Sequence, residues 1–320
     1  MGEPLLPNAY TQSWNLSVER QLGANLLEVA YVGTRGTHLL GSVSLNEVPA
    51  TVAQACPNCN ANSERPFPGY ATITAIEGRF SSHYNSLQAS VQRKVVKGLN
   101  GGISYTYASC ITNNSADRNE SSENTYDLSY GRGPCNFNLR QVVTGNYIYD
   151  VPFFQHVNRL LDGVFGGWKF SGITSFHTGD SLTPVQSYDP FRTRRNRLGI
   201  GMARGSTITP MLGTGSPNPA TRNVAQWFTN ANGAYADASE EFGNAGIGSL
   251  TGPHYLDFDM GLFKTFKITD MTKLQFRAES FNTFNHTNLG DPVMNIDSNF
   301  GQIQSDIQWR DMQLGLKLTF

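Results

Sequence analysis

Four cysteines are the residues whose spacing could most directly create a chemical site: Cys56, Cys59, Cys110 and Cys135. The CPNC segment could be half of a zinc site or a redox pair. No second CxxC and no suitably spaced histidine pair accompanies it, so a complete zinc site is not indicated. Disulfides formed in an oxidising compartment are the simpler interpretation. The simplest pairing joins Cys56 to Cys59 and Cys110 to Cys135.

A basic cluster is the second candidate site, and it consists of Arg192, Arg194, Arg195 and Arg197. Guanidinium groups bind carboxylates and phosphates, so the cluster could contact an acidic ligand or the phosphates of lipopolysaccharide. The alternative is an ordinary solvated loop. We interpret the cluster as a possible ligand-contacting loop.

Catalytic and cofactor chemistry is not indicated elsewhere in the chain. The histidines His38, His177, His254 and His286 have no catalytic partners at recognisable spacing, and the glycines of NAGIGSLTG do not lead from a strand into a helix. With 24 basic and 25 acidic residues the formal net charge is −1, which does not favour nucleic-acid binding. We therefore predict no enzymatic activity, no cofactor, no metal and no nucleic-acid partner.

The composition of the chain differs from that of an ordinary soluble domain. Only 15% of its residues are charged and 11% are aromatic, whereas soluble domains have about 25% charged residues. No window approaches the run of about 18 apolar residues that a membrane-spanning helix needs. The mean hydropathy is nevertheless −0.35. A membrane barrel reconciles these values, because its wall carries apolar residues only at alternate positions.

Alternation with period two recurs along the whole chain and predicts the elements that would position the candidate sites. About nine strands of roughly ten residues are expected, which is the length that a tilted strand needs to cross an outer membrane. Strands of soluble sandwiches are shorter, at about five or six residues, and a large soluble all-β domain is the alternative. The expected strands centre on residues 14–18, 27–31, 87–92, 103–107, 143–149, 168–176, 256–262, 274–279 and 312–320.

The connections between these segments alternate in length. Short turns are expected at LGAN, VVKGLN and KITDMT, and a medium connection at 151–167. Long connections are expected at residues 35–84, 110–138, 179–254 and 285–311. Outer-membrane barrels have short periplasmic turns and long extracellular loops, so the alternation orients each strand and leaves the C-terminus in the periplasm.

Charged residues test this assignment. Glu19, Glu28, Asp257, Asp259, Arg277 and Glu279 are expected on the face that lines the lumen. Arg93 and Lys264 are expected on the apolar face near its periplasmic edge, where their long side chains can reach water.

The C-terminal strand and many internal segments resemble one known family. The chain ends with apolar residues at alternate positions and a terminal aromatic residue: Met312, Leu314, Leu316, Leu318 and Phe320. Segments that resemble the barrel of Oar-like TonB-dependent receptors cover nearly the whole chain. They include QSWNLSVERQLG, AYVGTRGTHL, YNSLQASVQRKVVKGL, GNYIYDVPF, GWKFSGITSFHTGDSLTP, FGNAGIGSLTGPHYLDFDMGLFKTF, FRAESFNTFNHTN and RDMQLGLKLTF.

This resemblance implies a receptor with a signal peptide, often a carboxypeptidase-regulatory-like domain, a plug domain and a barrel of about 22 strands. It also implies that the terminal strand is the signal read by the barrel-assembly machinery. MGEPLLPNAY lacks the basic and apolar regions of a secretory signal, and an odd number of strands does not close a bacterial barrel. We therefore expect residues 1–320 to be the C-terminal part of such a barrel, a fragment without plug or signal peptide.

The predicted fold is thus an all-β, antiparallel, transmembrane segment of a Gram-negative outer-membrane barrel. The predicted function is that of a barrel wall for energised uptake of an unidentified ligand. Its partners would be outer-membrane lipid and the barrel-assembly machinery, with a plug domain and the TonB system only in the intact receptor. The alternative is a β-rich cell-surface binding or adhesin-like module.

Overall fold

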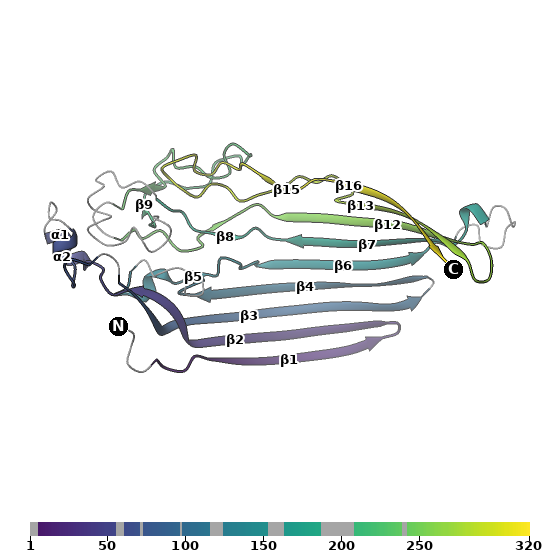
Figure 1. Cartoon of the computed structure of the whole chain (residues 1–320), viewed down its shortest axis with the longest axis horizontal. Helices are drawn as coiled ribbons and strands as arrows, with labels where there is room; N and C mark the ends of the chain where they lie inside the picture. The colour runs from purple at the N-terminus through teal and green to yellow at the C-terminus, as the bar shows by residue number, and fades with distance from the viewer. Residues whose placement is uncertain are drawn as a thin grey trace.

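A computed structural model describes residues 6–55, 61–70, 73–96, 98–115, 124–152, 163–186, 208–238 and 242–320. Its main element is an antiparallel sheet whose strands follow one another in the order β1-β2-β3-β4-β6-β7-β12-β13-β16, with β5 pairing beside β4 (Figure 1). These long strands are β1 (Tyr10–Leu22), β2 (Asn25–Ser44), β3 (Thr74–Val96), β4 (Leu99–Thr112), β6 (Gln141–Asp150), β7 (Trp168–His177), β12 (Tyr255–Lys267), β13 (Lys273–Phe281) and β16 (Asp311–Thr319). The predicted nearly all-β antiparallel architecture is confirmed.

The remaining elements are short. They are β5 (Gly133–Pro134), β8 (Ser181–Leu182), β9 (Met211–Leu212), β10 (Tyr235–Ala236), β11 (Leu250–Thr251), β14 (Asn288–Leu289), β15 (Asp306–Gln308), α1 (Ala50–Ala55), α2 (Ala61–Glu64) and a 3-10 turn at Leu128–Gly131. Among the described residues, no helix is long and apolar enough to cross a membrane.

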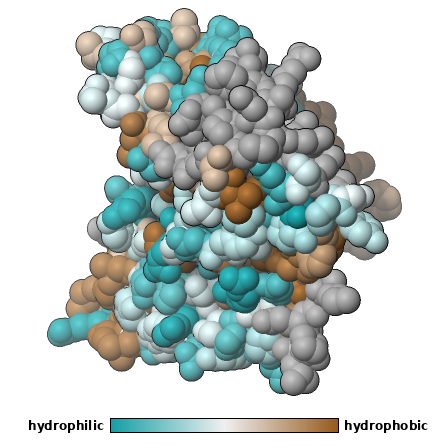
Figure 2. Space-filling model, turned by 90° about the vertical axis from the view of Figure 1, so that its left-hand side faces the viewer, coloured by the Kyte–Doolittle hydropathy of each residue, from teal (hydrophilic) through white to brown (hydrophobic). Residues whose placement is uncertain are grey.

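The two ends of the sheet differ as the connection lengths predict. The tight turns β1–β2, β3–β4 and β12–β13 lie at one end, together with the C-terminus, and we call this the turn end (Figure 1). The opposite end, the loop end, carries α1, α2, β5, β8 and β9. In Figure 2 the loop end faces the viewer, and the part of its surface that is coloured by hydropathy is largely hydrophilic with smaller hydrophobic patches.

The predicted bounds of the first long connection, residues 35–84, are wrong. Strand β2 continues to Ser44 and β3 begins at Thr74, so both strands extend well beyond the expected ends. Their pairing shifts register between Gly36 and Leu39 and again between Leu39 and Gly41. Such bulges interrupt the period-two pattern from which the strand ends were predicted, although the hydrogen-bonded ladder resumes beyond them.

Strand register places the alternating apolar residues on one face of the sheet. One row of paired residues crosses seven strands and is made of Val18, Val29, Ala89, Tyr105, Val143, Phe176 and Leu256. The neighbouring row faces the other way and is made of Glu19, Glu28, Ser90, Ser104, Thr144, Ser175 and Asp257. Side chains alternate between the two faces of a strand. The sheet therefore has one apolar face and one polar face throughout.

Buried hydrophobic clusters lie mainly in the loops. One cluster surrounds Phe228, Tyr235 and Leu250, and a second surrounds Val48, Ile208 and Ala238. Residues as distant in sequence as Leu182 and Phe300 pack against the first cluster. The long loops at the loop end are therefore packed against one another, and we call this assembly the loop cap.

The sheet has two unpaired edges in the described structure. Strand β1 pairs only with β2, and β16 pairs only with β13. Leu16 of β1 is 70% exposed and Leu314 of β16 is 77% exposed. Backbone groups at such an edge need partners within a membrane, because lipid supplies no hydrogen bonds.

Candidate functional site

The terminal residues predicted as the insertion signal lie on the apolar face. In β16, Leu314 pairs with Ala278, Leu316 with Phe276 and Leu318 with Leu274. All five predicted residues are more than half exposed, and Phe320 reaches 92%. The structure thus presents the C-terminal strand as an apolar stripe that is available for contact.

Aromatic residues lie at both ends of the apolar face. Towards the loop end, Arg140 lies over the ring of Tyr107, with Cζ 5.4 Å from the ring centroid, and its Nε donates to the Tyr107 hydroxyl at 3.1 Å. At the turn end, Trp168 packs edge-on against Phe276, with ring centroids 6.0 Å apart. Rings with polar tips at two levels are typical of the interfacial girdles of outer-membrane barrels.

Lys264 and Arg93 both lie on the apolar face, but the surroundings of their side chains differ. Lys264 is only 4% exposed. Its Nζ donates a hydrogen bond to the backbone carbonyl oxygen of Gly166 and lies 5.7 Å from the centroid of the Trp168 ring. The predicted snorkelling of Lys264 is therefore wrong, because its ammonium group is buried against Gly166 and Trp168 instead of reaching water. Arg93 lies near the turn end, opposite Asn25.

A disulfide joins Cys110 at the end of β4 to Cys135, with Cα atoms 5.4 Å apart. The Cys135 amide donates to the Cys110 carbonyl oxygen at 3.0 Å, and the Cys110 amide donates to Asn138 Oδ1 at 2.8 Å. The disulfide and these two hydrogen bonds together hold the loop that follows β4 against the strand. Cys56 and Cys59 lie outside the described residues, and so do Arg192, Arg194, Arg195 and Arg197.

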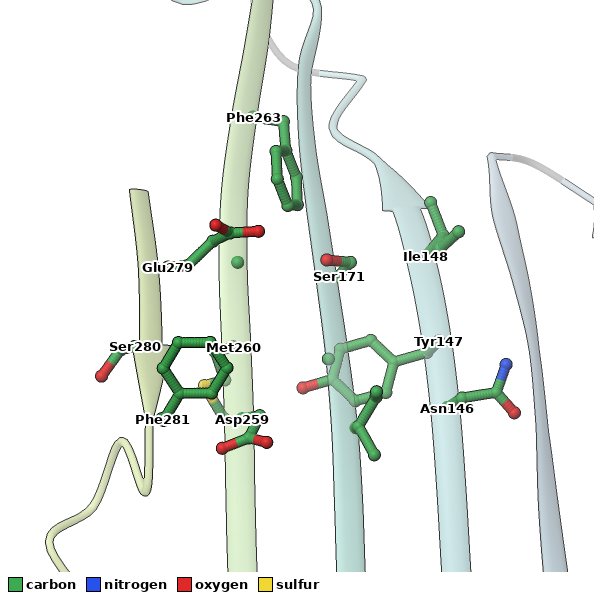
Figure 3. Close-up of a pocket in the computed structure, with 13 residues that line it drawn as sticks. Asn146, Tyr147, Ile148, Ser171, Asp259, Met260, Phe263, Glu279, Ser280 and Phe281 are labelled. Atoms are coloured by element: carbon green, nitrogen blue, oxygen red, sulfur yellow. The ribbon is translucent and has the colours of Figure 1, made fainter. Parts of the chain in front are cut away.

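The polar face carries a shallow hollow of about 330 Å³ across β6, β7, β12 and β13. Figure 3 shows its lining residues on these four neighbouring strands. Apolar side chains project into it from the polar face: Ile148, Ile173, Phe263 and Phe281. Ile148 is 47% exposed and Ile173 is 57% exposed. The hollow is thus an apolar area within a face that is otherwise polar.

Carboxylates border this hollow, and each has a defined partner. Glu279 Oε2 accepts a hydrogen bond from Gln313 Nε2 at 2.8 Å. Asp259 Oδ1 accepts one from the Asn282 amide at 3.0 Å. These hydrogen bonds hold the two carboxylates in place beside the apolar side chains of the hollow. They could therefore contact a ligand that has both an apolar and a cationic part.

Sequence reasoning identified the charges of this area and missed its apolar residues. Asp259, Arg277 and Glu279 lie on the polar face as predicted, and Arg277 Cζ lies 5.1 Å from the centroid of the Phe263 ring. Phe263 and Ile173 were not singled out, although each interrupts the polar half of its alternating strand. The signal that could have found them is an apolar residue at a position where the alternation expects a polar one.

The histidines serve local contacts. His177 stacks on Tyr255, with ring centroids 5.0 Å apart and planes 11° from parallel. His286 Nδ1 lies 3.0 Å from Asn288 Oδ1. Within the described part of the chain, no group of three or more His, Cys, Asp or Glu side chains could hold a metal ion.

Family comparison agrees with this two-faced architecture. A model of the outer membrane beta barrel domain matches residues 3–313. The chain belongs to this family. Membership places the barrel domain in the outer membrane.

A solved outer-membrane transporter resembles the barrel domain in fold. The outer membrane transporter YddB from Escherichia coli aligns with a TM-score of 0.53 and 12% identity, over 98% of this chain and 33% of YddB. A chain of the FpvAI–pyocin S2 complex aligns with a TM-score of 0.45 and 12% identity, over 98% of this chain and 28% of that one. The barrel domain therefore spans about a third of the length of the solved transporter. No curated protein sequence matches it.

Proposed function

We propose that this barrel domain is the C-terminal part of the barrel wall of an Oar-like TonB-dependent receptor that takes up a ligand across the outer membrane. The observation that carries the proposal is the register, which aligns an apolar face and a polar face across all the long strands. Such a wall needs lipid on one side and a wet lumen on the other. The segments that resemble Oar-like receptors, such as GWKFSGITSFHTGDSLTP, are the support for TonB dependence.

The unpaired edges support a larger barrel. Strands β1 and β16 each have one partner, and leaving the other edge open in lipid is strongly unfavourable. We propose that further strands of the receptor pair with both edges, and that a plug domain fills the lumen. Recognition of β16 and Phe320 by the barrel-assembly machinery would guide insertion.

Ligand contacts are proposed at the loop end and on the polar face. The hollow beside Asp259 and Glu279 would contact a ligand or the plug on its way through the lumen. The arginine cluster of residues 192–197 would bind acidic groups, and the disulfides would hold the loops in position. No chemical step at these sites is proposed.

Cell fractionation tests the membrane assignment and cross-linking tests the energy coupling. We expect the chain in the outer-membrane fraction after urea washing. We also expect the intact receptor to form cross-links with TonB that increase when ligand-containing medium is added. Absence of any TonB cross-link from correctly inserted receptor would refute TonB dependence and leave the barrel assignment standing.

The loop cap favours a second candidate, a cell-surface binding module. Phe228 and Tyr235 are almost completely buried in it, so the loops have a packed structure of their own. Preordered loops lose little conformational entropy when they bind a partner. Undiminished binding of a ligand to whole cells that lack TonB, without accumulation inside them, would favour this candidate.

A further inference from the structure

A second hollow lies on the apolar face, close to the turn end. It has a volume of about 410 Å³ and extends over β3, β4 and β6. Val91, Ile103 and Val143 form apolar walls. Because this face contacts lipid, the hollow opens towards the acyl chains of the membrane rather than towards the lumen.

Two glycines line the hollow. Gly101 pairs with Tyr147, and Gly145 pairs with Ile103, so both occupy positions on the apolar face where other strands carry large side chains. A Cβ atom at Gly145 would meet only the backbone oxygen of Gly102, at 3.7 Å. The space in front of Gly145 is therefore open and forms part of the groove between β3 and β6. At Gly101, in contrast, a Cβ atom would meet the backbone oxygen of Asn146 at 2.5 Å, so strand β6 approaches this glycine closely.

Arg93 borders this groove and has no ion pair within the described structure. It pairs across β3 and β4 with Gly101, so its side chain starts directly beside the open space. Its Nε is buried and has no hydrogen-bond partner among the residues that the structure describes. Its Nη1 makes one long contact, 3.5 Å from Asn25 Oδ1. A guanidinium beside an apolar groove, without a carboxylate to neutralise it, attracts an anion.

We propose that Arg93 and the Gly101–Gly145 groove form a binding site for one glycerophospholipid of the periplasmic leaflet. The phosphate accepts hydrogen bonds from the guanidinium, and an acyl chain lies in the groove. Arginine matches phosphate geometry, and basic side chains at the membrane boundary recognise anionic head groups. Because the short turns are periplasmic, the ligand is a phospholipid and not lipid A. The site rests on the outer-membrane location and is independent of transport.

Native mass spectrometry of the detergent-extracted chain with added phosphatidylglycerol tests the site. We expect wild type to retain one lipid molecule. Arg93→Gln should weaken retention about tenfold, which is the effect of losing hydrogen bonds to a charged group. Lys94→Gln is the matched control, because Lys94 is exposed and adjacent in sequence but does not line the groove. It should retain lipid as wild type does.

Gly145→Leu tests the groove without changing charge. Its side chain would occupy the space of an acyl chain, so retention should fall by a similar factor. Because the two variants act on different groups, a folding defect in one leaves the other decisive. Equal retention by wild type, Arg93→Gln and Gly145→Leu would overturn the site. Retention of lipid A in preference to phosphatidylglycerol would overturn the assigned leaflet and ligand.

Discussion

The ammonium group of Lys264 on β12 donates a hydrogen bond to the backbone carbonyl oxygen of Gly166, 98 residues earlier in the chain. It also lies 5.2 Å from the centroid of the Phe266 ring. A cation on the apolar face is costly in lipid. Here the cation joins Gly166, which lies just before β7, to the neighbouring strand β12, so it stabilises the turn end of the sheet.

Replacing this lysine should destabilise the protein. Lys264→Ala leaves the Gly166 carbonyl oxygen without its partner and removes the contact with two rings, so we expect the free energy of unfolding to fall by about 2 kcal/mol. Urea unfolding of the protein in lipid vesicles measures this free energy. Lys267→Ala is the control, because Lys267 lies on the same strand with a 64% exposed side chain in a surface ion pair to Asp270. Equal effects of the two substitutions would show that the buried contact contributes nothing.

The opposite faces of β16 should respond differently to the same charge. Leu314→Arg places a guanidinium on the lipid face, at a cost of about 2–4 kcal/mol near the membrane midplane. Gln313→Arg places it on the polar face, where the Gln313 side chain already contacts Glu279. We expect outer-membrane yield to fall sharply only for Leu314→Arg. Similar yields of both variants would contradict the assignment of the faces.

The disulfide between Cys110 and Cys135 closes a separation of 25 residues. Removing it in a Cys110→Ser/Cys135→Ser variant should lower the stability of the loop cap by about 2–4 kcal/mol, since the open chain gains conformational entropy. Limited proteolysis at residues 124–138 measures the change. A Cys56→Ser/Cys59→Ser variant is the control, and in it residues 124–138 should stay protected from the protease. If the Cys110→Ser/Cys135→Ser variant is cleaved in this segment at the wild-type rate, the prediction is refuted.

The loop cap should be sensitive to alkali through Tyr235. This side chain is 6% exposed and packs edge-on against Phe300, and burial raises the pKa of its hydroxyl. Since the folded-state pKa lies above the unfolded value of about 10, the stabilisation is complete below pH 10 or so. It is lost as pH rises towards the folded-state pKa, because the unfolded chain ionises first.

Tyr235→Phe should remove this part of the alkaline transition. Fluorescence of Trp227, which packs against the same cluster, reports opening of the cap. Tyr70→Phe is the control because Tyr70 is 67% exposed. An unchanged alkaline midpoint in Tyr235→Phe would mean that another group controls the transition.

Much of the fold was predictable because strand alternation is a local property. Val29, Ala89 and Tyr105 belong to strands whose neighbouring residues alternate, so the two faces followed from the sequence. The alternation of short and long connections also predicted the direction of each strand. Local pattern failed at the bulges near Leu39, since a bulge shifts the side chains without ending the ladder.

The candidate sites depend on tertiary structure. Alternation predicted that Arg93 lies on the apolar face. Only the register places Gly101 and Gly145 near it, because pairing between strands depends on residues far apart in sequence. The same holds for Lys264, whose partner belongs to another connection. The sequence by itself determined the period, the two faces and the membrane-adapted C-terminal strand. Tertiary structure decided which side chains meet, because cross-strand neighbours are set by hydrogen-bonded register and loop packing.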